Sequence, residues 1–134
     1  MKTTQILIAG FGGQGILFAG KFLAYKGLME DLQVSWLPSY GPEMRGGTCN
    51  CSVVISESTP VGSPVIADPD VLIALNRPSL DKFESTVKPG GYILADNVLW
   101  DGKVYASPLP TDAQTKGIYN FNKMVKEDPR VENV

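Results

Sequence analysis

The sequence predicts an α/β domain of three layers, with helices on both faces of a mostly parallel sheet. Three observations predict this class. A short apolar run near the start is typical of a buried strand, a glycine-rich turn follows it, and an apolar helical pattern follows the turn. Further along, strand-like and helix-like segments keep alternating, which places right-handed crossover helices between parallel strands. With 134 residues, we expect one domain over residues 1–134 with one core.

The opening pattern consists of a strand, a turn, a helix and a second strand. Residues Gln5 to Ala9 are apolar and rich in β-formers, which predicts a strand buried on both faces. Ile16 to Met29 carries apolar residues at helical spacing. Gln33 to Leu37 is the second predicted strand, and we expect Pro38 to end it because proline has no N–H to donate to a sheet.

The later elements are predicted from alternation and from breaking residues. Thr48 to Ser56 alternates between two faces, which predicts a strand with both cysteines on the same face. Ser79 is expected to cap a helix that runs to Val87 and ends at a Pro-Gly-Gly turn. The other expectations are a loop over Ser39–Gly47, strands at Val65–Ile66, Val71–Leu75, Tyr92–Ala95 and Val104–Ala106, and a helix over Ile118–Lys126.

Composition narrows the classes of function. A net charge of -2 argues against nucleic acid or an anionic membrane as a standing partner. The sequence contains no histidine, so it lacks the commonest general base and metal ligand. No apolar stretch approaches the roughly 20 residues of a membrane helix, and the first strand leaves no room for a signal peptide. With only two cysteines, these features predict a cytoplasmic protein.

Gly10, Gly12 and Gly15 have the GxGxxG spacing, with Gly13 and Gln14 inside it, between a predicted strand and a predicted helix. Glycines allow a tight turn and a close approach of backbone to a pyrophosphate at the helix N-terminus. A dinucleotide-binding domain usually also has an acidic residue at the end of its second strand, and this sequence has none there. Simple NAD binding is therefore disfavoured. Two interpretations stay open: a phosphate-bearing ligand, or glycines that serve only helix–strand packing.

A second cluster, Tyr-Gly-Pro-Glu-Met-Arg-Gly-Gly, covers Tyr40 to Gly47 and is expected at the carboxyl edge of the sheet, where ligands of open α/β folds bind. Arg45 offers a planar fork for a carboxylate or phosphate. The alternative is an ion pair of Arg45 with Glu43 that only joins a surface loop, and composition alone favours it. The candidate ligand-binding residues of both clusters are Gly10, Gly12, Gly13, Gln14, Gly15, Tyr40, Glu43, Arg45, Gly46 and Gly47.

Cys49 and Cys51 suggest a zinc or iron–sulfur site, but both kinds of site normally need four ligands. We therefore expect two buried structural thiols and no metal site in this chain. No Ser/His/Asp set and no paired carboxylates stand out either. The lack of visible catalytic residues favours a subunit of a larger enzyme over an enzyme that works alone.

Several blocks of the chain together resemble the gamma subunit of 2-oxoacid:ferredoxin oxidoreductases. The blocks are Ala9–Gly15, Ser35–Thr48, Val61–Pro64, Pro69–Asn76 and Lys88–Gly91. The Ser35–Thr48 block is far more specific than a lone GxGxxG, and the resemblance covers nearly the whole chain. Within the family, the chain is most similar to the 2-oxoglutarate and branched-chain 2-oxoacid forms, which include the pyruvate/ketoisovalerate gamma subunits.

The resemblance implies a Rossmann-like domain in a complex that decarboxylates a 2-oxoacid oxidatively, with 2-oxoglutarate favoured. Coenzyme A would accept the acyl group and ferredoxin the electrons. Thiamine diphosphate would bind between the alpha and beta subunits, and the iron–sulfur clusters would lie on other subunits, including a ferredoxin-like one. The gamma subunit would contribute to the coenzyme A side of the active site and would not be active alone.

The resemblance also sets limits. The family pattern continues beyond Val134 with a further helix, so we expect the sequence to stop short of the domain's C-terminal end. Asp112 to Asn122 matches the family poorly, so no functional residue is assigned there. Two alternatives stay open: a structural scaffold subunit whose glycine loops serve subunit contacts, and a nucleotide-binding Rossmann domain of another enzyme.

Overall fold

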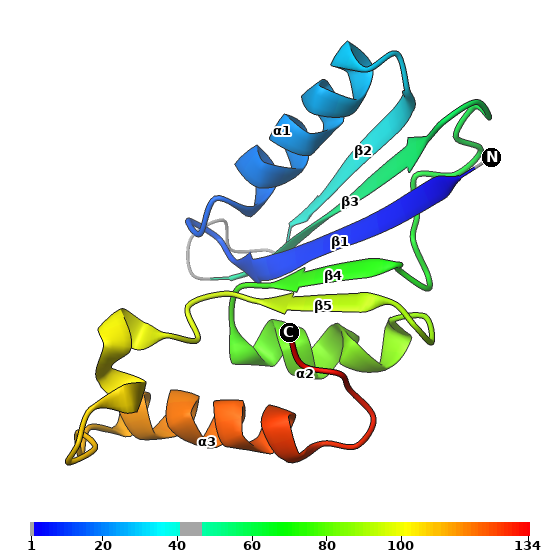
Figure 1. Ribbon diagram of the computed structural model, residues 1–134. Helices are drawn as coiled ribbons and strands as arrows, with labels where there is room; N and C mark the ends of the chain where they lie inside the picture. The colour runs from blue at the N-terminus through cyan, green and yellow to red at the C-terminus, as the bar shows by residue number, and fades with distance from the viewer. Residues whose placement is uncertain (1, 41–46) are drawn as a thin grey trace. The chain divides into compact units, whose positions relative to one another are not determined.

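The computed structural model describes residues 2–40 and 47–134, which form two compact units, Met1–Asp96 and Asn97–Val134 (Figure 1). The first unit carries the sheet and both predicted motifs. Its elements are β1 (Thr3–Phe11), α1 (Ile16–Met29), β2 (Gln33–Tyr40), β3 (Thr48–Ser56), β4 (Val71–Ala74), α2 (Arg77–Phe83), the 3-10 turn η1 (Glu84–Thr86) and β5 (Tyr92–Ala95). The predicted single domain over residues 1–134 stays a prediction.

The sheet has five strands in the order β2-β3-β1-β4-β5. β1 pairs with β4, and β4 with β5, in parallel. β3 pairs antiparallel with both of its neighbours, so β2 runs in the same direction as β1 and β3 is the one reversed strand. Helices α1 and α2 lie on opposite faces of this sheet (Figure 1). The predicted α/β class with helices on both faces is therefore confirmed.

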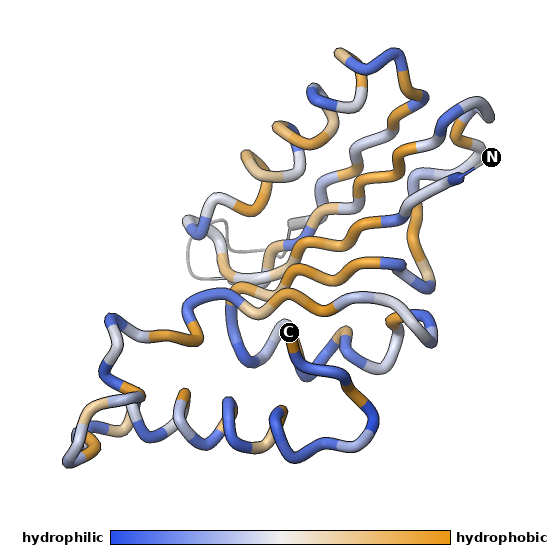
Figure 2. The backbone as a smooth tube through the Cα atoms, in the orientation of Figure 1, coloured by the Kyte–Doolittle hydropathy of each residue, from blue (hydrophilic) through white to orange (hydrophobic). Residues whose placement is uncertain are grey.

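The core lies between α1 and the middle of the sheet, where the strands are mostly apolar (Figure 2). Ile8, Ile16, Cys49 and Cys51 are buried together there. α1 can approach so closely because of Gly20, where a Cβ would collide with the Cys51 sulfur and lie 2.9 Å from Trp36 Nε1. The prediction that both cysteines face the core from one side of a strand is confirmed.

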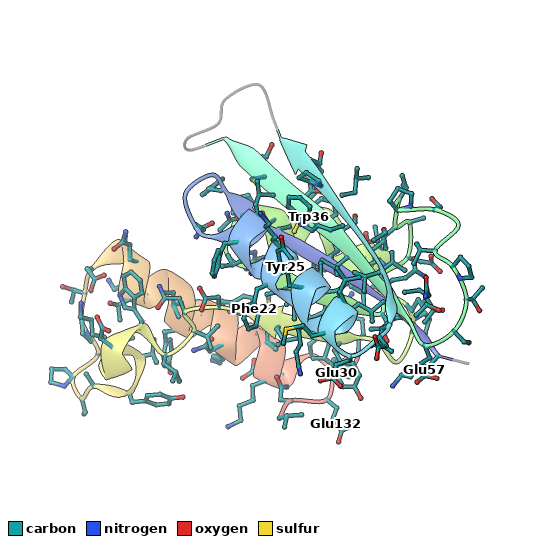
Figure 3. All side chains as sticks on the ribbon, turned by 90° about the horizontal axis from the view of Figure 1, so that it is seen from above. Phe22, Tyr25, Glu30, Trp36, Glu57 and Glu132 are labelled. Atoms are coloured by element: carbon teal, nitrogen blue, oxygen red, sulfur yellow. The ribbon has the colours of Figure 1, made fainter. Side chains whose placement is uncertain are left out.

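The opposite face of α1 carries large exposed apolar side chains beside the exposed Lys21 and Lys26, which is unusual for a surface helix. Four large side chains lie one or two turns apart along it: Phe18, Phe22, Tyr25 and Met29. They are 76%, 62%, 56% and 79% exposed, respectively. Figure 3 labels Phe22 and Tyr25 along this helix. We call these four residues the α1 stripe.

The amino ends of β1 and β4 are joined by Asp70. Its carboxylate accepts from the Gln5 amide at 2.8 Å and pairs with Lys88 Nζ at 3.0 Å. Partial burial raises the pKa of this carboxyl group, but the Gln5 amide and the Lys88 ammonium outweigh burial, so the pKa lies below its usual value. The ionised form of Asp70 is therefore the one that the fold stabilises.

Some of the predicted elements of the first unit differ from the structure for physical reasons. β2 continues through Pro38 to Tyr40, because β2 is an edge strand and proline is tolerated at a sheet edge. α2 is capped by Asn76, whose side chain accepts from Ser79 N at 2.9 Å, so the cap predicted at Ser79 was wrong. The predicted strand at Val65–Ile66 is absent, since both residues lie in irregular structure.

The second unit contains the 3-10 segment η2 (Trp100–Tyr105) and α3 (Ala113–Glu127). η2 occupies most of the predicted strand Val104–Ala106, which was therefore wrong, because Asp101 and Gly102 take positive φ values of 52° and 76° and turn the chain. The helix predicted over Ile118–Lys126 is confirmed within α3, which begins after the Asp112 cap. Among the helices of the described ranges, none combines the length and apolarity needed to span a bilayer.

Candidate functional site

The glycine-rich turn lies between a strand and a helix, as predicted, and it lies at the carboxyl edge of the sheet. β1 ends at Phe11 and α1 begins at Ile16, so the turn between them forms the loop Gly12–Gly15. Because β4 runs parallel to β1, its own carboxyl end, Leu75 and Asn76, lies beside this loop. β2 also ends at this edge, with Tyr40. The edge therefore gathers the ends of three strands that point in one direction.

Two residues of the loop have backbone conformations that favour glycine. Gly13 has a φ of 99° and Gly15 a φ of 80°, and apart from chain neighbours no atom of the described residues lies within 4 Å of where a Cβ would stand on either residue. Both residues are exposed. A side chain at Gly13 or Gly15 would therefore be strained by the backbone and not by crowding.

The loop presents amide groups that could bind an anion. Within residues 2–40 and 47–134, the N–H groups of Gly13 and Gly15 have no hydrogen-bond acceptor, and the first helical bond of α1 is donated by Ala19 to the Gly15 carbonyl. The N–H groups of the first turn of α1 are thus free of intrahelical partners as well. Free amides at a helix N-terminus, with its positive dipole end, suit a phosphate or carboxylate.

Gly10 contributes to the site through packing, since it is buried at the end of β1. A Cβ there would lie 2.6 Å from Gln14 Oε1, 2.9 Å from Ile16 Cδ1 and 3.1 Å from Leu75 Cβ. The absence of a side chain at Gly10 therefore makes room for the side chain of Gln14. Of the two interpretations of the glycine motif, a phosphate-bearing ligand or close packing, the structure supports packing for Gly10.

Gln14 is exposed, and its amide is bonded to the protein on both sides. Its Oε1 accepts from Phe11 N at 2.6 Å and from Asn76 Nδ2 at 3.1 Å, and its Nε2 donates to the Leu75 carbonyl at 2.9 Å. Asn76 and Leu75 were not among the predicted site residues. An Asn two residues before a proline, followed by a helical pattern, is an N-cap signal that could have identified Asn76.

The second motif meets the first at this edge. The Gly12 N–H donates to the Gly47 carbonyl at 2.9 Å. Tyr40 and Gly10 both pair with Cys49, from β2 and β1, so one row across the sheet connects the two motifs. Glu43, Arg45 and Gly46 lie outside the described residues, and their part in the site stays a prediction.

The two cysteines beneath this edge are free and buried. Cys51 donates its thiol to the Ile16 carbonyl at 3.5 Å. Burial raises the pKa of Cys51 to about 11 and also raises the pKa of Cys49. A thiol that stays protonated at neutral pH is a poor nucleophile and metal ligand. Within the part of the chain that is described, no three residues of the His, Cys, Asp and Glu types gather as a metal site.

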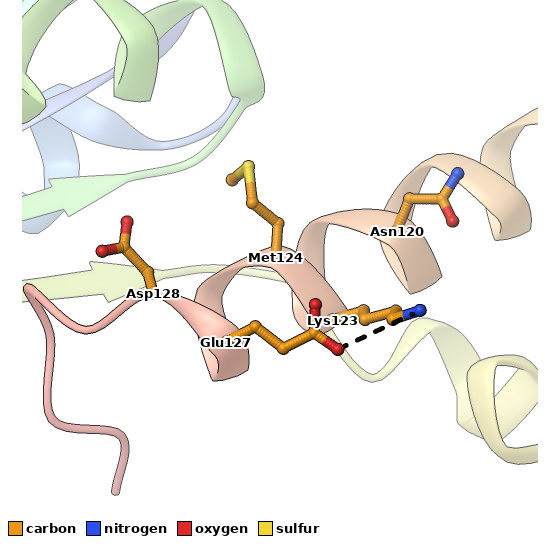
Figure 4. Close-up of a pocket in the computed structure, with 5 residues that line it drawn as sticks. All are labelled: Asn120, Lys123, Met124, Glu127 and Asp128. Atoms are coloured by element: carbon orange, nitrogen blue, oxygen red, sulfur yellow. Dashed lines mark ion pairs between the residues drawn. The ribbon is translucent and has the colours of Figure 1, made fainter.

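A shallow hollow on the second unit belongs to a different part of the chain (Figure 4). It is lined by Asn120, Lys123, Met124, Glu127 and Asp128 of α3 and its C-terminal end. Lys123 Nζ lies 4.0 Å from Glu127 Oε1, with both side chains exposed. This hollow contains none of the predicted site residues, and an exposed ion pair of this kind contributes little energy.

Known proteins are similar to this chain over most of its length. The family model for pyruvate ferredoxin/flavodoxin oxidoreductase matches residues 5–134. A ketoisovalerate oxidoreductase subunit VorA of Methanothermobacter marburgensis is 50% identical over 100 residues, covering 75% of this chain and 21% of the relative. A 2-oxoglutarate synthase subunit KorC of Methanocaldococcus jannaschii is 40% identical over 134 residues, covering 97% of this chain and 69% of the relative.

Two solved structures have a similar fold. The gamma subunit of keto/oxoacid ferredoxin oxidoreductase from Geobacter sulfurreducens has a TM-score of 0.58 and 34% identity, covering 71% of this chain and 51% of that one. The 2-oxoglutarate:ferredoxin oxidoreductase from Magnetococcus marinus has a TM-score of 0.64 at 19% identity, covering 96% of this chain and 28% of that one. This chain thus spans about a fifth of the VorA relative and about half of the Geobacter subunit.

These matches agree with the resemblance carried by the two motifs. The family model covers most of the chain, including both motifs and the strands that position them. The chain therefore belongs to the pyruvate ferredoxin/flavodoxin oxidoreductase family, and its likeness there is to the gamma subunits of 2-oxoacid:ferredoxin oxidoreductases.

Proposed function

We propose that this chain is the gamma part of a 2-oxoacid:ferredoxin oxidoreductase, where it forms one side of the coenzyme A site and a surface for subunit assembly. The complex would decarboxylate a 2-oxoacid oxidatively, with coenzyme A as acyl acceptor and ferredoxin as electron acceptor. Thiamine diphosphate and the iron–sulfur clusters would be bound by the alpha, beta and ferredoxin-like subunits. The chain itself would bind and position coenzyme A and would assemble with the other subunits.

The observation that carries this proposal is the pair of amide groups of Gly13 and Gly15, which have no acceptor among the described residues and lie at the N-terminus of α1, next to the contact of Gly12 with Gly47. Coenzyme A has phosphate groups, and backbone N–H groups at a helix N-terminus suit them. The second strand ends without a carboxylate for a ribose, in contrast to an NAD site. Arg45, in the second motif, is proposed to bind another anionic group of coenzyme A.

The relatives support the reaction class and leave two candidate substrates. KorC is named as a 2-oxoglutarate synthase subunit and is matched over most of this chain, which supports 2-oxoglutarate as the substrate to test first. VorA, which is named for ketoisovalerate, supports a branched-chain 2-oxoacid as the alternative. The Magnetococcus enzyme, which shares the fold, has been solved with 2-oxoglutarate, coenzyme A and succinyl-CoA bound. Its likeness makes coenzyme A the appropriate ligand for testing the loop.

The α1 stripe supports the role in assembly. A surface helix normally turns its large apolar side chains to the core, whereas the four residues of the α1 stripe are exposed. Exposed aromatic and methionine side chains in one row are typical of protein contact surfaces. We propose that another subunit of the complex covers the α1 stripe.

Kinetics on the assembled complex test the proposed ligand. Gly12→Val places a bulky residue in the loop, and Arg45→Lys replaces a planar fork with an ammonium. We expect both variants to raise the KM for coenzyme A by roughly ten-fold, the scale of one lost contact to an anion. The KM for the 2-oxoacid should change much less, because that substrate would meet the cofactor on other subunits.

The result also separates this proposal from the scaffold alternative. If either variant prevents assembly, as seen by size-exclusion chromatography, the loops serve subunit contacts and the scaffold alternative gains support. If the complex assembles and neither KM moves, this chain has no part in binding coenzyme A.

A further inference from the structure

We propose that Gln14 is a positioning residue, which holds the glycine loop in its anion-binding conformation by fastening it to the carboxyl end of β4. This inference rests on the proposed function, because it assigns Gln14 an effect on the ligand through the loop. The reason is that, among the described residues, the side-chain amide of Gln14 bonds to Phe11, Leu75 and Asn76. We call the contact of Gln14 with Leu75 and Asn76 the Gln14 clasp.

The side chain of Gln14 makes three hydrogen bonds. Oε1 accepts two hydrogen bonds, from Phe11 N at 2.6 Å and Asn76 Nδ2 at 3.1 Å, and Nε2 donates to the Leu75 carbonyl at 2.9 Å. A primary amide has one acceptor oxygen and one donor group, and here both are engaged. Two of the three bonds join the loop to a strand that is distant in sequence.

The residues next to the clasp leave room for it and bond to it. Gly10 has no side chain where Gln14 Oε1 lies, since a Cβ there would stand 2.6 Å from that oxygen. The side-chain amide of Asn76 makes two hydrogen bonds. Its Nδ2 donates to Gln14, and its Oδ1 accepts from Ser79 N at 2.9 Å. Asn76 therefore links the glycine loop to the start of α2.

The clasp should affect the conformation of the loop more than the free energy of unfolding. Gln14 is exposed, and its bonds to Leu75 and Asn76 are exposed as well. Exposed hydrogen bonds between uncharged groups contribute little to the free energy of unfolding, because water replaces them when they break. Gly13 and Gly15, in contrast, have many accessible backbone conformations, so a nearby tether narrows the set that the loop adopts. The effect expected from Gln14 is thus on loop conformation, with little change in global stability.

Two variants remove the clasp from opposite sides. Gln14→Met keeps the length of the side chain and removes its donor and acceptor. Asn76→Ser replaces the capping amide with a hydroxyl that can still cap α2 but is too short to reach Gln14. In the assembled complex we expect each variant to speed hydrogen exchange at the Gly12 and Gln14 amides, which donate to the Gly47 and Phe11 carbonyls. Each should also raise the KM for coenzyme A by about three- to ten-fold, with kcat at saturating coenzyme A unchanged.

The double variant and a loop control decide between explanations. If both residues act through one clasp, the double variant should raise the KM no more than Gln14→Met alone. Additive effects, unchanged loop exchange, or an unchanged KM would each overturn the proposal. Gly13→Ala changes the loop itself and leaves the clasp in place. If Gly13→Ala raises the KM for coenzyme A while Gln14→Met and Asn76→Ser do not, the positioning role of Gln14 is wrong and the coenzyme A role stands. If none of the three changes the KM, the coenzyme A role itself is wrong, and the positioning role is overturned with it.

Discussion

The Gly12 N–H donates to the Gly47 carbonyl at 2.9 Å, and this bond joins the two motifs that the sequence places far apart. Gly12 belongs to the turn after β1, and Gly47 comes directly before β3. Because β3 is the reversed strand of the sheet, its amino end lies at the same edge as the carboxyl ends of its neighbours. The reversal of β3 is thus what brings the second motif to the glycine loop.

We predict that the isolated chain turns over no 2-oxoacid, even when thiamine diphosphate and coenzyme A are supplied. The sequence contains no histidine and only two cysteines, and burial raises the pKa of both thiols, so the chain lacks ordinary acid–base and cluster ligands. Reduction of an acceptor dye is the measurement. A rate from the pure chain that exceeds a no-protein control would contradict the account.

Replacing Cys49 and Cys51 together by alanine should lower the free energy of unfolding by about 1–3 kcal/mol through lost packing. Metal content, measured by elemental analysis, should be the same in the wild type and the double variant. Stoichiometric iron or zinc that disappears in the variant would show that the cysteines are ligands.

Cys51 should also contribute a pH dependence. Its folded pKa, about 11, lies above the ordinary thiol value, so its contribution to stability is complete below pH 9 and is lost as the pH rises towards 11. Unfolding midpoints of the wild type and Cys51→Ala should therefore converge as the pH rises through this window. A difference that stays constant from pH 8 to pH 11 would contradict the raised pKa.

Asp70 should give the opposite dependence. Its folded pKa is lowered, so the stability that it contributes is present above its ordinary pKa and is lost as the pH falls through the folded value. Asp70→Asn, which removes the charge facing Lys88, should be less stable than the wild type at pH 7, and the difference should shrink in acid. Urea unfolding at several pH values measures this, with Asp81→Asn as control, since Asp81 pairs with Arg77 only on an exposed helix surface.

The α1 stripe should matter for assembly and little for folding. Phe22→Asp changes a side chain that is 62% exposed, so the unfolding midpoint should stay close to that of the wild type. The assembled complex should be weakened, as measured by co-purification with the partner subunits. Tyr105→Asp is the matched control, because it changes a 75% exposed aromatic residue of the second unit. If the wild type, Phe22→Asp and Tyr105→Asp assemble equally well, the α1 stripe is not a contact surface for another subunit.

Much of the fold could be predicted because it depends on local patterns. The alternation over Thr48–Ser56 gave the bounds of β3, and the apolar run with its glycine turn gave β1 and the start of α1. Pro38 was misjudged because tolerance of proline depends on β2 being an edge strand, which no local pattern reveals. Val104 was misjudged because a three-residue apolar run outweighed the Asp-Gly turn signal just before it.

The candidate site was predictable in its residue types and not in its contacts. The glycine spacing identified the loop between β1 and α1. The pairing of Gln14 with Asn76 depends on β1 and β4 being neighbours, although other strands lie between them in the sequence. Such a contact follows from strand order, and strand order comes from packing of the whole sheet.

The most direct test of the central claim is coenzyme A titration of the assembled complex by calorimetry, with Gly13→Ala and Gly90→Ala compared. Both glycines have positive φ values, 99° and 78°, and no crowding of the missing Cβ by the described residues, so alanine should strain both turns alike. Only Gly13 lies in the proposed ligand loop. The account predicts a Kd for coenzyme A raised by about ten-fold in Gly13→Ala and unchanged in Gly90→Ala. A wild-type Kd in both variants of an intact complex would contradict it.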